Sequence, residues 1–158
     1  IVRACQDLPG QELFQYMDDA GQKHGVGSGD VNDYLREITG QDFTAKEFRT
    51  WAAAVSVAAE LQRLGPAELE TEARKNVVAA VKATAQSLGN TPAVCRKSYI
   101  HPAIIGAYLD GSLIPKLDEW KGGTTSNSSY RLRPKEAAVL RFLKHASSGR
   151  KKRTHSTS

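Results

Sequence analysis

The fold is decided around residues 88–102, whose sequence is LGNTPAVCRKSYIHP. Its glycine is a good stop for a preceding helix. A new helix can begin directly afterwards, because the Thr91 hydroxyl can cap the first free amides and Pro92 fits the first helical position. A second proline, Pro102, disfavours helical geometry at the residue before it. The stretch therefore predicts the end of one helix, the start of another near Pro92, and a helix break just after Tyr99.

Helical patterns continue on both sides of this stretch. Residues 67–88 have apolar positions at helical spacing, with acidic residues in the first half and lysines later, an order that complements the helix dipole. Residues 103–109 are predicted to form a short helix, and a proline opens a last helix over residues 134–148.

Two further helices are predicted upstream. One covers residues 44–64 and begins with a capping box, in which its first threonine and Glu47 satisfy free amides. The other is capped by Ser28 or Asp30, has one apolar stripe, and ends at Gly40. 

The segment before these helices is less regular. Residues 1–7 are expected to be the end of a helix, and residues 13–27 a short hairpin or an extended loop. The sequence thus predicts a mainly α fold with at most a small β-hairpin near the N-terminus.

Composition limits the class of protein. With 158 residues and 40% hydrophobic content, the chain can bury one core of ordinary single-domain size. Its net charge of +5 and its pI near 9.3 suit a polyanionic partner, although charge by itself is weak evidence. No apolar run approaches the roughly 20 residues of a membrane span, and no signal-peptide pattern opens the chain, so we expect a cytoplasmic protein. Cys5 and Cys95 lack the spacing of a disulfide framework or a zinc site and are expected to be reduced.

The chemistry of the central stretch depends on Tyr99. A tyrosine hydroxyl has an ordinary pKa of about 10 and is a weak nucleophile, so covalent catalysis needs cations and donors that stabilise negative charge. Arg96 and Lys97 lie close in sequence, and the Asn90 amide could donate to a non-bridging phosphate oxygen. The alternative is that Tyr99 is an amphipathic core residue and that the two cations form a solvated face. Periodicity alone favours this alternative.

Longer motifs favour the catalytic interpretation. Residues 88–102 resemble the nucleophile segment of type IB DNA topoisomerases, especially the bacterial and poxvirus-like branch. Residues 42–51, DFTAKEFRTW, resemble the arginine segment of the same family, and residues 3–14 resemble the stretch that precedes it. The similarity covers about residues 1–110 in the family's order and spacing. Two long motifs in register are far more specific than a single tyrosine.

The resemblance implies a helical catalytic domain of the type IB topoisomerase and tyrosine recombinase kind. Such an enzyme relaxes supercoiled double-stranded DNA without metal, ATP or another cofactor, through a 3′-phosphotyrosyl intermediate that the released 5′-hydroxyl later reverses. Tyr99 matches the nucleophile, Arg49 an arginine that neutralises the non-bridging oxygens, and Asn90 a position where many relatives carry histidine. We also expect a monomer associated with a bacterial nucleoid. The residues expected to contact the DNA backbone are Lys46, Arg96 and Lys97.

The same resemblance suggests a domain organisation. Residues 1–121 would form the catalytic core, N-terminally incomplete because the chain begins inside a helix and without methionine. Residues 122–133 are rich in Gly, Thr and Ser and are expected to be a flexible linker. The helix over 134–148 would follow, and then a disordered basic tail over 149–158.

One departure from the family pattern is serious. The family's active site also uses a second arginine and a general-acid lysine from a segment upstream of the arginine motif, and neither has a matching position in this chain. The chain thus holds three of the family's five catalytic positions. General acid catalysis typically contributes about a hundred- to ten-thousand-fold. We therefore predict that these 158 residues relax DNA poorly or not at all on their own.

Two other interpretations remain open. A tyrosine recombinase or integrase shares the arrangement, but its arginine motif usually has a histidine two residues before the arginine, where this chain has Glu47. The third possibility is a non-catalytic DNA-binding remnant. The histidines have no metal-ligand spacing, and His101 is expected to be a helix-end residue; they are His24, His101, His145 and His155.

Overall fold

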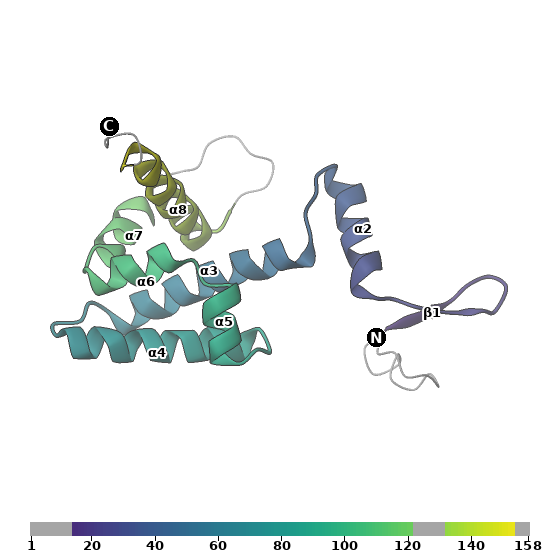
Figure 1. Ribbon diagram of the computed structural model, residues 1–158, viewed down its shortest axis with the longest axis horizontal. Coiled ribbons are helices and arrows are strands. Elements are labelled where there is room, and N and C mark those ends of the chain that lie inside the picture. Colours follow the sequence, from purple (N-terminus) through teal and green to yellow (C-terminus); the bar gives the residue numbers. More distant parts are fainter. Residues whose placement is uncertain (1–13, 122–131, 154–158) are drawn as a thin grey trace. The chain divides into compact units, whose positions relative to one another are not determined.

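Helices make up most of the protein in the computed structural model, which describes residues 14–121 and 132–153, with side chains up to residue 120 and from 132 to 148. The chain divides into two compact units, Ile1–Phe48 and Arg49–Ser158. Figure 1 shows the helices and the small hairpin. The predicted mainly α fold is confirmed. The helix end predicted at 1–7 and most of the linker predicted at 122–133 lie outside the described residues.

The described part of the first unit begins with an antiparallel hairpin, as predicted for this region. Strand β1 (Gln15–Met17) pairs with β2 (Lys23–Gly25), and Tyr16 lies opposite His24. Asp18 organises the turn, because its carboxylate accepts two backbone N–H groups and contacts His24 Nε2 at 2.8 Å. These hydrogen bonds, that of His24 first, lower the pKa of Asp18.

Helix α2 (Ser28–Thr39) starts one residue earlier than the predicted caps allow. The N-cap is Gly27, and Asp30 lies in the first turn, where its carboxylate accepts the Gly27 N–H at 2.8 Å. The prediction of Ser28 or Asp30 as N-cap is therefore wrong, because a carboxylate in the first turn can reach back to the cap amide. Gly40 ends the helix at a φ of 63°, as predicted. No α2 residue is buried, so the predicted stripe is exposed; it includes Val31, Tyr34 and Ile38.

Helix α3 (Ala45–Leu64) begins with half of the predicted capping box. The Glu47 carboxylate accepts the Thr44 N–H at 2.9 Å and also contacts the Thr44 hydroxyl, which donates to it instead of capping the helix. Asn32 completes the start by accepting the Ala45 N–H at 3.0 Å. The hydrogen bonds from Thr44 lower the pKa of Glu47 below its ordinary value of 4.5.

This lowered pKa predicts a pH dependence of stability. The carboxylate contributes fully above the unfolded-state pKa, and its contribution is lost as the pH falls through the lower folded-state pKa. Glu47→Gln keeps an acceptor for the Thr44 N–H but does not titrate. Between about pH 5 and pH 3, near the ordinary glutamate range, the free energy of unfolding of the wild type should therefore fall more steeply than that of the variant. Urea titrations at a series of pH values test this, and parallel curves would contradict it.

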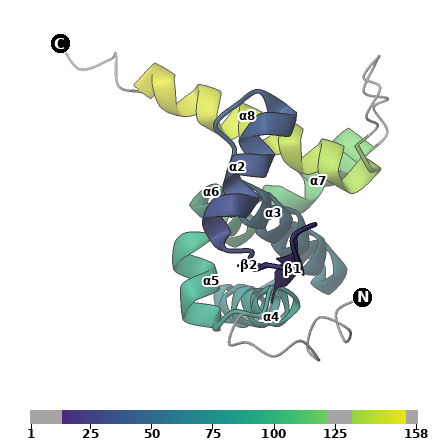
Figure 2. The same ribbon diagram turned by 90° about the vertical axis from the view of Figure 1, so that its right-hand side faces the viewer.

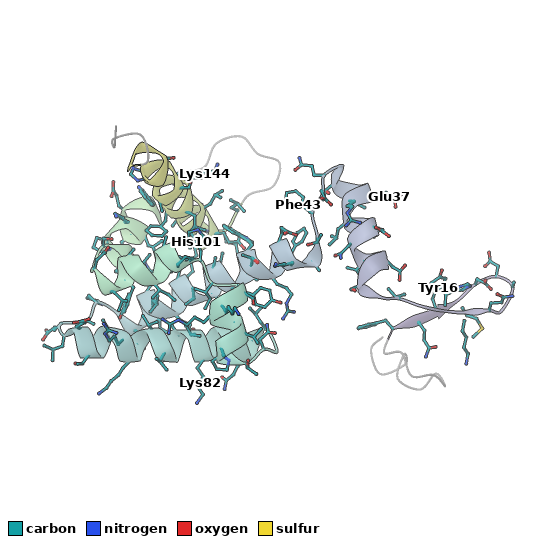
Figure 3. The ribbon with its side chains drawn as sticks, viewed as in Figure 1. Tyr16, Glu37, Phe43, Lys82, His101 and Lys144 are labelled. Carbon is teal, nitrogen blue, oxygen red and sulfur yellow. The ribbon has the colours of Figure 1, made fainter. Side chains whose placement is uncertain are left out.

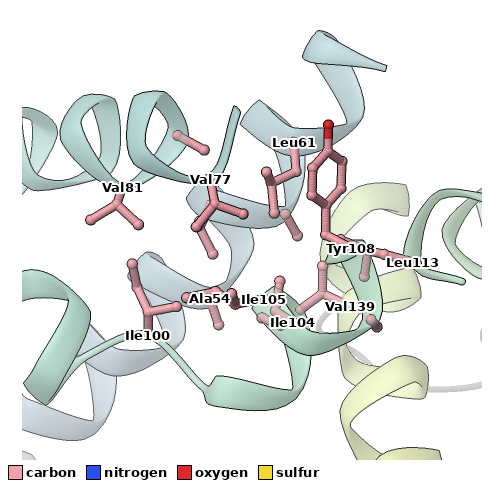
Figure 4. Packing of buried hydrophobic residues seen from close by; sticks show 14 of the residues in the cluster. Ala54, Leu61, Val77, Val81, Ile100, Ile104, Ile105, Tyr108, Leu113 and Val139 are labelled. Atoms are coloured by element: carbon pink, nitrogen blue, oxygen red, sulfur yellow. The ribbon is translucent and has the colours of Figure 1, made fainter. Parts of the chain in front are cut away.

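The second unit is a set of helices around one core. It contains most of α3, followed by α4 (Glu70–Ser87), α5 (Pro92–Ser98), α6 (Pro102–Leu109), α7 (Leu113–Lys121) and α8 (Pro134–Arg153). Figure 4 shows side chains of these helices meeting in that core. The largest fully buried apolar side chains are Leu61, Ile104, Leu113 and Val57. No helix of the described segments is long and apolar enough to cross a bilayer.

Leu61→Ala should cost about 2–5 kcal/mol of unfolding free energy, because it leaves a cavity among helices that cannot fully collapse. Leu61 is 0% exposed. Leu69→Ala is the matched control, since that leucine is 67% exposed. Denaturant unfolding of both variants measures the difference, and equal stabilities would show that the core does not depend on α3 at this point.

The C-terminal helices differ most from the sequence prediction. Helix α7 was not predicted, and it carries Pro115 in its first turn, where the missing N–H would be unpaired in any case. Helix α8 continues to Arg153, beyond the predicted end at residue 148. The two helices lie against each other (Figure 2), with Arg141 Nη1 donating to the Trp120 carbonyl at 3.4 Å. Residues 149–153 are therefore helical, and residues 154–158 of the expected tail lie outside the described part.

Candidate active site

The candidate site is built on the connection between α4 and α5. Leu88 is the C-cap of α4, and Gly89 follows at a φ of 65°, the left-handed conformation that glycine adopts without strain. Gly89 N–H donates to the Gln86 carbonyl at 3.2 Å, and Asn90 N–H donates to the Ala85 carbonyl at 2.9 Å. This pair of hydrogen bonds is the Schellman motif, which ends a helix sharply. It leaves the Leu88 carbonyl available to other donors.

Arg49 is the first of those donors. It lies in α3 and is half-buried, and its Nη2 donates to the Leu88 carbonyl oxygen at 2.7 Å. The two acidic residues nearest to it in the sequence have other contacts: Asp42 pairs with Arg36 at 2.8 Å, and the Glu47 carboxylate accepts the Thr44 N–H at 2.9 Å. Among the described residues, no ion pair involves Arg49. The arginine is thus held by a helix end, and not by a carboxylate that would neutralise it.

Asn90 reaches the same carbonyl. Its Nδ2 lies 3.4 Å from the Leu88 oxygen, a long contact, and the side chain is half-buried. The Thr91 hydroxyl then accepts the Val94 N–H at 3.3 Å, and Pro92 begins α5, as the sequence predicts. Because Gly89 ends one helix and Thr91 caps the next, the backbone of Asn90 is held in place from both sides.

Tyr99 closes the arrangement. It is the C-cap of α5, at the predicted helix break, and is half-buried. The Arg49 Cζ atom lies over the Tyr99 ring, 5.3 Å from its centroid, a distance typical of a cation–π contact. The structure therefore brings Arg49 together with Asn90 and Tyr99, which belong to a much later stretch of the sequence. Their catalytic roles stay a prediction.

The basic residues predicted to contact DNA are exposed. Arg96 and Lys97 lie in the last turn of α5, where positive charge also complements the helix dipole. Arg96 is three residues before Tyr99 and so lies on the same side of the helix. Lys46 is exposed in the first turn of α3 and belongs to the first unit. A role in DNA binding stays a prediction for all three.

Two neighbouring residues have structural roles. Cys95 is 0% exposed, and burial raises the pKa of its thiol while the charge of Arg49 acts in the opposite direction. His101 is the N-cap of α6, where its Nδ1 accepts the Ala103 N–H at 3.2 Å, so the predicted helix-end histidine is confirmed. Figure 3 labels His101 at this helix start. Within the described part of the chain, no three His, Cys, Asp or Glu side chains are grouped as a metal site.

Two cavities in the described part of the chain lie away from the candidate site. A cavity of about 260 Å³ lies beside Tyr108 and Glu70, and another of about 700 Å³ beside Trp120 and Phe142. Neither is lined by Arg49, Asn90 or Tyr99.

Comparisons with known proteins identify the family of the chain. Residues 1–113 match the family of the eukaryotic DNA topoisomerase I catalytic core. The chain is also 35% identical over 107 residues to DNA topoisomerase 1B of Acanthamoeba polyphaga mimivirus, an alignment that covers 63% of this chain and 32% of that protein. The chain thus spans about a third of the length of this relative. The matched family residues include the segments of Arg49, Asn90 and Tyr99, and the chain belongs to the type IB DNA topoisomerase family.

Proposed function

We propose that the chain carries the strand-cleaving part of a type IB DNA topoisomerase, which relaxes supercoiled duplex DNA without metal or ATP. The observation that carries the proposal is the position of Arg49 in a chain of this family: it shares the Leu88 carbonyl with Asn90 and lies over the ring of Tyr99. The proposal includes action as a monomer in the bacterial cytoplasm.

The proposed reaction is a reversible transesterification, in which one phosphodiester bond is exchanged for another. The Tyr99 hydroxyl oxygen forms a bond to the scissile phosphorus and loses its proton, while the bond from phosphorus to the 5′-oxygen breaks and that oxygen gains a proton. The protein is then attached to the 3′ end of the cut strand. Attack by the 5′-hydroxyl reverses both steps. The phosphodiester energy is kept in the covalent link, so no nucleotide is consumed.

The other residues stabilise the charge that develops. The Arg49 guanidinium offers a planar fork of donors suited to two non-bridging oxygens. Asn90 can donate a hydrogen bond to the same phosphate without titrating. Asparagine in place of histidine at this position is familiar in the bacterial branch, and we propose that the chain belongs to the bacterial and poxvirus-like branch. Lys46, Arg96 and Lys97 would hold the DNA backbone, and their contribution should weaken as salt rises.

The unmatched general acid should limit the rate at which this chain cleaves DNA. No position in it matches the family's second arginine or its general-acid lysine, so relaxation of ordinary DNA should be slow. A substrate with sulfur in place of the 5′-bridging oxygen removes this limit, because a thiolate leaves without being protonated. Such a substrate therefore tests the nucleophile without requiring a general acid.

The test is covalent capture on that substrate. The chain is incubated with duplexes that contain one 5′-bridging sulfur within randomised flanking sequence, in the presence of a chelator, and the mixture is denatured. We expect protein attached to the 3′ end of the cut strand. Salt-sensitive DNA binding without any adduct, even after the matching upstream segment of a relative is supplied in trans, would overturn the proposal in favour of a DNA-binding remnant.

A further inference from the structure

We propose that the C-terminal turn of α4 positions Arg49 for reaction, and that Gly89 is the positioning residue on which this turn depends. The inference rests on the proposed function, in which Arg49 contacts the scissile phosphate. It concerns a group that the motifs do not reveal, the backbone carbonyl of Leu88.

The Leu88 carbonyl is a suitable group for holding a guanidinium. The last carbonyls of a helix have no partner within the helix and carry the negative end of its dipole, so they favour a cation. Arg49 Nη2 donates to this oxygen at 2.7 Å, and Asn90 Nδ2 approaches it at 3.4 Å. Because a carbonyl is neutral, it orients the arginine without cancelling the charge that would attract a phosphate.

Gly89 sets the direction of this carbonyl. Its φ of 65° allows both Schellman hydrogen bonds, from Gly89 to Gln86 and from Asn90 to Ala85. A residue that avoids this conformation would turn the Leu88–Gly89 peptide and move the oxygen away from Arg49. A Cβ atom at Gly89 would meet no atom within 4 Å, so only the backbone conformation opposes a side chain there.

A second hydrogen bond fixes α3 against α4 near the site. Ser56 Oγ lies 3.2 Å from Thr84 Oγ1, and Thr84 is 0% exposed. Ser56 is two turns along α3 from Arg49, and Thr84 is one turn along α4 from Leu88. The Thr84 carbonyl also accepts the Leu88 N–H at 3.2 Å and the Ser87 hydroxyl at 2.9 Å. The two helices are thus linked at two levels, which sets where Arg49 meets the turn.

The consequence is preorganisation of a long side chain. An arginine that is already held needs less ordering when it binds phosphate, and its fork keeps its geometry relative to the Tyr99 ring. Loss of the turn should therefore slow the covalent step more than it weakens DNA binding, because DNA is also held by other cations. This difference separates positioning from a merely structural role.

Three variants test the inference by covalent capture on the sulfur-containing duplex. Gly89→Ala should lower the rate of adduct formation at saturating DNA by about ten- to a hundredfold, the scale of small misplacements, with little change in DNA affinity. Gly89→Asn should restore most of that rate, because asparagine tolerates positive φ. Gly106→Ala, in the middle of α6 with no atom within 4 Å of the added Cβ, is the control and should react like the wild type. Equal rates for wild type and Gly89→Ala would overturn the inference.

A second readout does not depend on activity. In nuclear magnetic resonance spectra, the Arg49 guanidinium protons should exchange slowly with water in the wild type, Gly89→Asn and Gly106→Ala, and rapidly in Gly89→Ala. Rapid exchange in the wild type, or no change in Gly89→Ala, would overturn the positioning role. An absence of any adduct together with the expected exchange pattern would count against the proposed function and in favour of the positioning of Arg49.

Discussion

Tyr99→Phe is expected to abolish the covalent product completely, on ordinary and on sulfur-containing DNA, while DNA binding stays close to that of the wild type. The substitution removes only the hydroxyl oxygen that would bond to phosphorus. The contact with Arg49 should remain, because a cation interacts with the face of the ring and phenylalanine retains that face. Gel analysis of denatured reactions, with DNA affinity measured in parallel, checks both parts.

Tyr34→Phe is the matched control. Tyr34 lies in α2, is 60% exposed, and belongs to the first unit. Its variant should form adduct at the wild-type rate. If Tyr99→Phe still became attached to DNA, another nucleophile would be responsible, and mapping of the attached peptide would identify it.

Arg49→Ala should reduce the rate of adduct formation by about a hundred- to a thousandfold, the usual effect of removing one donor that stabilises a developing anion. Arg49→Lys should recover only part of this loss, because an ammonium group keeps the charge but not the planar fork. The rate at saturating DNA, measured by covalent capture, is the quantity to compare.

A neutral substrate sharpens this second test. If a methyl group replaces one non-bridging oxygen, the phosphate loses its charge, and the difference between wild type and Arg49→Ala should shrink. Arg63→Ala is the control, since that arginine is 68% exposed near the other end of α3 and pairs with Glu60. An undiminished difference on the neutral substrate would show that Arg49 acts on something other than phosphate charge.

Local signals in the sequence predicted much of the site. The glycine stop, the threonine cap and the two prolines fix the ends of α4, α5 and α6 within a few residues, because each of these residue types has a narrow backbone preference. Tyr99 is at the predicted helix break for this reason. Its proximity to Arg49 did not follow from such signals, and it was expected only from the family motifs.

Other features depend on tertiary contacts that no local pattern encodes. The position of Leu88 in the site could not be predicted from its side chain, because its backbone carbonyl makes the contacts. The glycine that follows it is the one local signal. Helix α7 was missed because Pro115 suggests a break unless its position in the first turn is known. Helix α4 begins at Glu70 and not at residue 67, because Leu69 is extended and serves as the N-cap.

Two buried residues near Tyr99 limit how its backbone can move. Cys95, one turn before Tyr99, is 0% exposed, and Ile100, directly after it, is 6% exposed; both belong to the core. The backbone of residue 99 is therefore fixed on both sides, and Tyr99 N–H donates to the Cys95 carbonyl at 3.0 Å. In mechanical terms, a DNA end joined to this hydroxyl would pivot mainly about the tyrosine's own side-chain bonds. Swivelling of the strand would then leave the helices undisturbed.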